Sequence, residues 1–258
     1  CRGGAPLYVI PGFYGLDERD SLKTFSRGGS DITGAIVARA VKTELYENWS
    51  DVSGIYLADP RIASQAPVVA HLTYHELALL AQLGASVFHR DAVEPVVEPA
   101  IPIRVKNTND VEAAGTLITG EREIACQPLV GISGLPSVHR LLTTKGATLI
   151  LDQLKIDYYG ELEGEGVYLT SPLSIEARGA LSGAGLSFSS EKALVGVVGE
   201  GWQADSPLAT KIRAELNGQN IPFTLISNSG AHLALIETEP SYYTTLIEVL
   251  VEVLRDPA

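Results

Sequence analysis

Residues 26–41 of the chain read Ser26-Arg-Gly-Gly-Ser-Asp31-Ile-Thr-Gly-Ala-Ile-Val-Ala-Arg-Ala-Val41. The first part is rich in glycine and predicts a loop, whereas the mostly apolar remainder predicts a helix with Ser30 or Asp31 as its N-cap. A short apolar run at residues 7–10 comes before the loop and ends at a Pro-Gly pair, which is typical of a buried strand that runs into a turn. The stretch therefore opens with a strand, a glycine loop and a helix.

Downstream segments continue this alternation of strands and helices. Residues 45–49 favour a strand, residues 71–83 have helical periodicity, and residues 86–88 and 101–105 favour further strands. Strands that alternate with helices predict an α/β sheet in which most strands are parallel.

The glycine loop also has features that favour the binding of an anion. A helix that begins after a loop presents free backbone N–H groups and the positive end of its dipole at one point, where a carboxylate or phosphate is stabilised. Arg27 can add a bidentate contact to a carboxylate. The alternative is a plain turn and helix cap without a ligand, and the loop taken alone leaves both open.

A second segment with a chemical reading is Ser50-Asp-Val-Ser-Gly-Ile-Tyr-Leu-Ala-Asp-Pro-Arg61. Tyr56 offers a ring to an adenine and Arg61 offers a cation to phosphates. By itself, the segment favours the other interpretation, a solvated surface loop with a structural tyrosine.

The sequence changes in texture near residues 115–123, and the remainder holds two small modules. The last module has the order βαββα that ferredoxin-like folds use, and a weaker copy of the same order comes before it. The predicted elements are 129–132, 147–154, 156–160, 167–169 and 174–181 in the first module, and 194–198, 206–216, 223–226, 232–236 and 242–254 in the second.

Composition excludes some classes of function. The chain has 19 Lys and Arg against 31 Asp and Glu, a net charge of −12, so we expect no nucleic-acid binding. No stretch approaches the ~18 apolar residues of a membrane span. The two cysteines lack disulfide or metal-ligand spacing, which predicts a reduced, cytoplasmic protein. A chain that begins at Cys1 and contains no methionine indicates either a missing N-terminal segment or methionines left out of the sequence.

Taken together, the motifs resemble those of the aspartate kinases over nearly all of residues 7–118. The resemblance implies a monofunctional enzyme without a homoserine dehydrogenase extension, and an α/β fold. That fold is part of an amino-acid-kinase three-layer sandwich, followed by two ferredoxin-like ACT domains. It divides the chain at 1–120 (C-terminal part of the catalytic domain), 121–190 and 191–258 (the two ACT domains). The segments that carry the resemblance are Gly12-Phe-Tyr-Gly15, Phe25-Ser-Arg-Gly-Gly-Ser-Asp-Ile-Thr33, Ser50-Asp-Val-Ser-Gly-Ile-Tyr56, Ala58-Asp-Pro-Arg61, Gly84-Ala-Ser-Val-Phe-His89 and Ile101-Pro-Ile-Arg-Val-Lys-Asn-Thr108.

The family's site residues are carried over position by position. The resemblance implies that Arg27 binds the α-carboxylate of L-aspartate and that Gly29 and Ser30 line the same pocket. Asp31 would be the catalytic residue that orients the substrate amine or a catalytic lysine. ATP would contact Ser50, Asp51, Tyr56, Arg61 and Ser86.

One residue of this site departs from the family pattern, and no metal site is expected. Ser86 stands where many aspartate kinases carry a lysine, which weakens the nucleotide assignment there. No metal ligands are expected from the protein, because Mg²⁺ would arrive with ATP and be held mainly by its phosphates.

The function implied is the ATP-dependent phosphorylation of the L-aspartate β-carboxylate to 4-phospho-L-aspartate, the first step of lysine, threonine and methionine biosynthesis. An amino-acid effector, lysine or threonine, would bind the ACT domains, which would also form a homodimer. Because the family's lysine-bearing N-terminal segment is absent, we expect this chain alone to be inactive. The alternative is a non-catalytic regulatory subunit or a dimerisation module.

Overall fold

The computed structural model describes residues 7–25, 28–85, 92–123, 129–141, 147–154, 156, 158–159, 168–170, 173–200, 202, 206–226 and 232–255. Among these residues, no helix is long and apolar enough to cross a membrane.

The helix of the opening motif forms as predicted, but it begins earlier than expected. A hairpin of β1 (Tyr14–Leu16) and β2 (Leu22–Thr24) precedes α1 (Gly29–Val41). The N-cap is Gly28, with φ of 84°, so the prediction of Ser30 or Asp31 as N-cap is wrong. Glycine holds this left-handed backbone without a steric penalty, which lets the helix start directly at the loop.

Residues 7–10 lie outside any strand, and the predicted buried strand is wrong for this chain. Their side chains are exposed, with Leu7 at 91% and Val9 at 89%. The apolar run and the Pro-Gly pair predicted a strand, but none of the described strands pairs with it.

A four-stranded sheet follows, in the order β3 (Tyr46–Ser50), β5 (Ile103–Asn107), β6 (Thr116–Thr119) and β4 (His71–Thr73). The pairs β3–β5 and β4–β6 are parallel and β5–β6 is antiparallel, which confirms the mainly parallel α/β prediction. Helix α1 packs on β3 and on the short helix α3 (Glu94–Val97).

The helix predicted at 71–83 divides into β4 and α2 (Tyr74–Gln82). Thr73 stops the strand and caps the helix: its hydroxyl accepts the backbone N–H of Glu76, and the Glu76 carboxylate accepts the backbone N–H of Thr73. This reciprocal capping box fixes the boundary that periodicity alone placed three residues too early.

The remainder forms one six-stranded antiparallel sheet in the order β11-β12-β10-β7-β9-β8, and the βαββα order occurs twice, as predicted. The first copy is β7 (Gly131–Arg140), α4 (Ala147–Leu154), β8 (Tyr158–Tyr159), β9 (Tyr168–Thr170) and α5 (Ile175–Gly183). The second is β10 (Lys192–Val198), α6 (Pro207–Gly218), β11 (Phe223–Leu225), β12 (Leu233–Thr238) and α7 (Tyr243–Arg255), with a short 3-10 turn at Pro240–Tyr242 before α7.

Strand β7 is much longer than the predicted strand at 129–132, and it serves both copies. Residues 131–135 and Val138 pair with β10, and residues 138–140 pair with β9. One continuous sheet therefore contains strands from both copies, on either side of the boundary predicted at residue 190. The boundaries predicted at residues 120 and 190 stay predictions.

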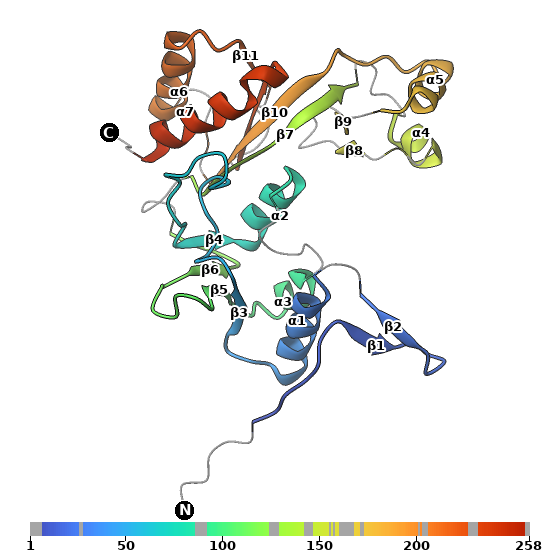
Figure 1. The fold of residues 1–258 in the computed structure, drawn as a ribbon, viewed down its shortest axis with the longest axis vertical. Coiled ribbons are helices and arrows are strands. Elements are labelled where there is room, and N and C mark those ends of the chain that lie inside the picture. Colours follow the sequence, from blue (N-terminus) through green and yellow to red (C-terminus); the bar gives the residue numbers. More distant parts are fainter. Residues whose placement is uncertain are drawn as a thin grey trace, which may run out of the picture.

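The core shows which parts of the chain fold together. One hydrophobic cluster joins the four-stranded sheet and α2 to β7, β10, β12 and α7, whereas a smaller cluster lies under α4 and α5. Figure 1 shows α2 between the two sheets, with α6 and α7 at one end of the long sheet and α4 and α5 at the other. The second copy thus shares one hydrophobic core with the four-stranded sheet and α2.

Helix α2 approaches the long sheet closely because glycines face it. A Cβ built on Gly131 would lie 2.4 Å from Leu80, and one built on Gly196 would lie 2.2 Å from Leu83. Both leucines are buried, so each packs directly on the backbone of a strand. Any larger residue at either glycine would have to displace the helix or its side chain.

A buried ion pair lies in the first turn of α2, and its carboxylate also bonds to the segment that follows β10. The Arg122 guanidinium donates to both carboxylate oxygens of Glu76 at 2.6–3.1 Å, and the backbone N–H of Glu200 donates to the same carboxylate at 3.1 Å. The side chains of Arg122 and Glu76 are 1% and 0% exposed. The carboxylate therefore ties α2 to the segments that follow β6 and β10.

Candidate functional site

Asp31 lies in the first turn of α1 and faces β3. The side-chain amide of Asn48 donates to its carboxylate at 2.9 Å and to the Tyr46 hydroxyl at 3.3 Å. The Tyr46 hydroxyl donates to the backbone carbonyl of Asp31 at 3.2 Å. Burial raises the pKa of Tyr46, and the nearby Asp31 charge adds to this against the opposing bond from Asn48, so the hydroxyl stays a donor at neutral pH.

The neighbours of Asp31 are packed as a tight turn. Gly29 is buried, and a Cβ there would lie 2.4 Å from the Cβ of Phe25, so no side chain fits. Ser30 is exposed and lies against Gly12, whose ideal Cβ would be 3.2 Å from the Ser30 Cα. These residues leave the Ser30 hydroxyl available to a ligand. Arg27 lies outside the described residues.

The segment 50–61 begins where β3 ends and is fastened to β5 and β6. Thr108 donates from its backbone and its hydroxyl to the Ser50 carbonyl, at 2.8 and 2.9 Å. The Thr116 hydroxyl accepts the backbone N–H of Ile55 at 2.8 Å, close beside Gly54. With φ of 133° and Thr116 this near, Gly54 leaves no room for a side chain. These hydrogen bonds therefore hold the segment 50–61 against the sheet.

Arg61 is paired with Asp59 in a two-pronged contact, with N–O distances of 2.6–3.1 Å. The Arg61 hydrogen bonds lower the pKa of Asp59 against the effect of burial, and the same pair raises the pKa of Arg61. The Arg61 side chain is 83% exposed. Its guanidinium is therefore charged and reachable by an anion, which would compete with the carboxylate of Asp59.

A pocket of about 500 Å³ brings these residues together, within the size range of ligand sites. Ser50, Asp51, Tyr56 and Arg61 line it, so four of the five residues predicted to contact ATP share one cavity. The fifth, Ser86, lies outside the described residues, although Gly84 and Ala85 just before it line the pocket.

Asp31, Gly29 and Ser30 do not line this pocket, but β3 connects the two groups. Asn48, which binds Asp31, and Ser50, which lines the pocket, are two residues apart on the strand. Such side chains point to the same face, roughly 7 Å apart. Strand β3 therefore contacts Asp31 through Asn48 and begins the lining of the pocket at Ser50.

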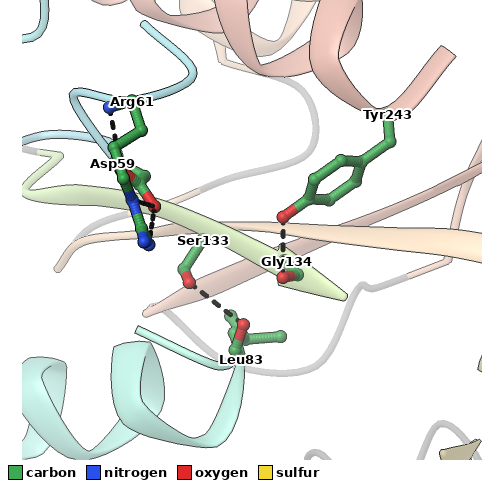
Figure 2. Close-up of polar contacts among 6 residues, drawn as sticks. All are labelled: Asp59, Arg61, Leu83, Ser133, Gly134 and Tyr243. Carbon is green, nitrogen blue, oxygen red and sulfur yellow. Dashed lines mark hydrogen bonds and ion pairs between the residues drawn. The ribbon is translucent and has the colours of Figure 1, made fainter. Parts of the chain in front are cut away.

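The other wall of the pocket is formed by residues of β7 and α7, which the sequence analysis did not predict as site residues. Ile132, Ser133 and Gly134 of β7 and Tyr243 and Ile247 of α7 line the same cavity. Figure 2 shows the Asp59–Arg61 pair, Ser133, Gly134 and Tyr243 around β7. No motif in the sequence marks these residues, because nothing local connects them to the segment 50–61. Among the described parts of the chain, no cluster of three metal-ligating side chains forms.

Comparisons with known proteins agree with this arrangement. Residues 3–107 match the sequence model of the amino acid kinase family. Aspartokinase 3 of Bacillus subtilis is 40% identical over 127 residues, which are 49% of this chain and 28% of that protein. Aspartokinase of Rickettsia prowazekii is 35% identical over 170 residues, 66% of this chain and 36% of that protein.

Solved structures extend the match over nearly the whole chain. Aspartate kinase of Clostridium acetobutylicum superposes with a TM-score of 0.80 and 29% identity, covering 95% of this chain and 62% of that one. Aspartokinase III of Escherichia coli, solved with aspartate and ADP, gives 0.74 and 22%, covering 95% and 60%, a likeness that shows the fold.

Residues 3–107 therefore resemble a segment of an amino acid kinase domain. The chain is similar to aspartate kinases over most of its length, as the motifs had indicated, and it spans about a third of the length of the curated relatives given above.

Proposed function

We propose that this chain is the C-terminal part of an aspartate kinase, which transfers the γ-phosphoryl group of ATP to the β-carboxylate of L-aspartate. The product is 4-phospho-L-aspartate, the first intermediate toward lysine, threonine and methionine. The observation that carries the proposal is the single pocket lined by Ser50, Asp51, Tyr56 and Arg61. Its position beside Asp31, along β3, supports a phosphoryl donor and an acceptor bound side by side.

The chemistry requires positioning and charge neutralisation more than covalent help, because a carboxylate must approach a γ-phosphate of the same charge. Arg27 binds the α-carboxylate of aspartate, with Gly29 and Ser30 beside it, and Asp31 orients the amine. Arg61 leaves Asp59 to bind the phosphates. Mg²⁺ enters with ATP and is held mainly by phosphate oxygens.

The chain by itself supplies few cations to this reaction, so we expect it to bind MgATP but not to turn it over. The test is calorimetric titration with MgATP, together with hydroxylamine trapping of acyl phosphate in the presence of ATP and aspartate. Binding without hydroxamate is the expected result. Hydroxamate that requires both substrates would show that the chain is active alone, and the absence of any MgATP binding would contradict the proposed function.

The tail, with its repeated βαββα order, supports a pair of ACT domains that bind an amino-acid effector and form a homodimer. The effector is lysine or threonine. We expect titration of the chain with lysine, threonine and methionine to give saturable heat with lysine or threonine. Heat and thermal shift absent for all three would leave the tail a structural module only. A purely regulatory subunit is disfavoured, because residues 3–107 match the kinase family.

A further inference from the structure

The segment 50–61 is bonded directly to the tail of the chain. The backbone N–H of Ile132, in β7, donates to the carbonyl of Leu57 at 2.6 Å. One residue further along β7, the Ser133 hydroxyl donates to the Leu83 carbonyl at the end of α2, at 3.0 Å. Both bonds hold β7 against the first part of the chain, at two residues of β7 that line the pocket. The second also satisfies a carbonyl that the end of a helix leaves without an intrahelical partner.

Tyr243, in α7, lines the same wall of the pocket as β7 and contacts that strand. Its hydroxyl donates to the carbonyl of Gly134 at 2.8 Å, as Figure 2 shows. A Cβ on Gly134 would lie 2.5 Å from the carbonyl oxygen of Leu194, so this strand position is fixed by close packing of backbone on backbone. The phenol therefore closes the pocket by bonding to a rigid part of the sheet.

Tyr243 also faces the charged rim of the pocket. Burial raises the pKa of its hydroxyl, and the negative charge of Asp59 raises it further. The hydroxyl thus remains a donor at neutral pH, and the ring lies in the electrostatic reach of the Asp59–Arg61 pair. Ile247, one helical turn along α7, lines the same cavity.

We propose that the C-terminal module forms the second wall of the nucleotide pocket, and that Tyr243 is a positioning residue for the bound nucleoside triphosphate. This inference rests on the proposed function, since it assumes that the pocket takes a nucleotide. The ring and its bond to Gly134 set the distance between the tail and the segment 50–61. A nucleotide whose phosphates draw Arg61 away from Asp59 occupies the space between these two walls.

The test is calorimetric titration of MgATP into the chain and four variants. Tyr243→Ala removes the ring and the bond to Gly134, and we expect it to raise the Kd by about 10-fold. Tyr243→Phe keeps the ring and should restore most of the affinity, leaving an increase of about 3-fold. Tyr242→Ala is the matched control, because Tyr242 packs beside the same core and does not line the pocket. It should leave the Kd within about 2-fold of wild type.

Arg61→Ala tests the site itself and should raise the Kd by about 10-fold or more, because it removes a charge-assisted contact to phosphate. If the chain binds MgATP and Arg61→Ala weakens binding while Tyr243→Ala does not, the inference is wrong and the proposed function stands. If wild type fails to bind, or Arg61→Ala has no effect, the nucleotide site is wrong and the inference falls with it. Circular dichroism melts identify a variant that fails to fold, and Tyr243→Phe then decides the question.

Discussion

Replacing Glu76 with alanine is expected to lower the free energy of unfolding by about 3–5 kcal/mol, because it leaves the Arg122 guanidinium buried without its carboxylate. The same substitution removes the acceptor for the backbone N–H groups of Thr73 and Glu200. It therefore weakens the start of α2 and its link to the segment after β10 at once. Urea denaturation followed by circular dichroism measures the change.

The matched control is Glu98→Ala. Glu98 pairs with Arg39, but its side chain is 77% exposed, so we expect the variant to stay within about 0.5 kcal/mol of wild type. Equal losses for Glu76→Ala and Glu98→Ala would mean that burial of the Glu76–Arg122 pair contributes nothing.

The same pair predicts a dependence of stability on pH. Burial tends to raise the pKa of Glu76, but the hydrogen bonds from Arg122 and from two backbone N–H groups outweigh it and lower the pKa below its ordinary 4.5. The unfolded chain then binds a proton before the folded chain does. Stability from this group is present above pH 4.5 and is lost as pH falls through the lowered pKa. Glu76→Gln should flatten this acid limb of the stability curve, and a limb of unchanged steepness would contradict the assignment.

Leu83→Ala is the second large effect, with an expected loss of about 2–5 kcal/mol. Leu83 is fully buried at the end of α2 and packs on the backbone of Gly196 in β10. Removing the side chain leaves a cavity between the two sheets that the rigid strand cannot fill. Leu149→Ala is the control, since Leu149 is 68% exposed in α4 and should tolerate the same change.

A double variant makes this prediction specific to the contact. Gly196→Ala alone places a Cβ 2.2 Å from Leu83 and should destabilise the fold. In Leu83→Ala/Gly196→Ala the added methyl group meets a shortened side chain, so the double variant should be more stable than the sum of the two losses predicts. Strict additivity in chemical denaturation would show that the helix and the strand do not meet at this point.

Local chemistry made some of the structure predictable. The glycine loop and the apolar run after it specify α1, and the βαββα order of the tail follows from its strand and helix patterns. The starts of helices were less predictable. Ser30 and Asp31 are good N-cap residues by type, yet Gly28 takes the position because its backbone adopts a positive φ. Thr73 shows the converse, since its capping box splits an apparently continuous helical pattern.

The apolar segment 7–10 shows the limit of pattern reading. An apolar run that ends at a Pro-Gly pair predicts a buried strand. Such a strand needs a neighbouring strand, and none of the described strands pairs with these residues. Strand β7 shows the same limit in reverse. A pattern suggesting four residues became a strand of ten, because both halves of the tail supply edges with which it pairs.

The sequence by itself indicated the kinase-like class of the first part, since the motifs in the segments 25–33 and 50–61 are local and follow one another along the chain. It also predicted aspartate-binding residues in the first of these segments and nucleotide-binding residues in the second. Only the tertiary structure decided that Ser133 and Tyr243 line the same pocket as the segment 50–61. It also decided that the Glu76 carboxylate bonds both to Arg122, after β6, and to the backbone N–H of Glu200, after β10. These contacts depend on the packing of α2 against glycines in β7 and β10, two strands that are far from α2 in the sequence. Packing between such segments leaves no periodic or motif signal in the chain.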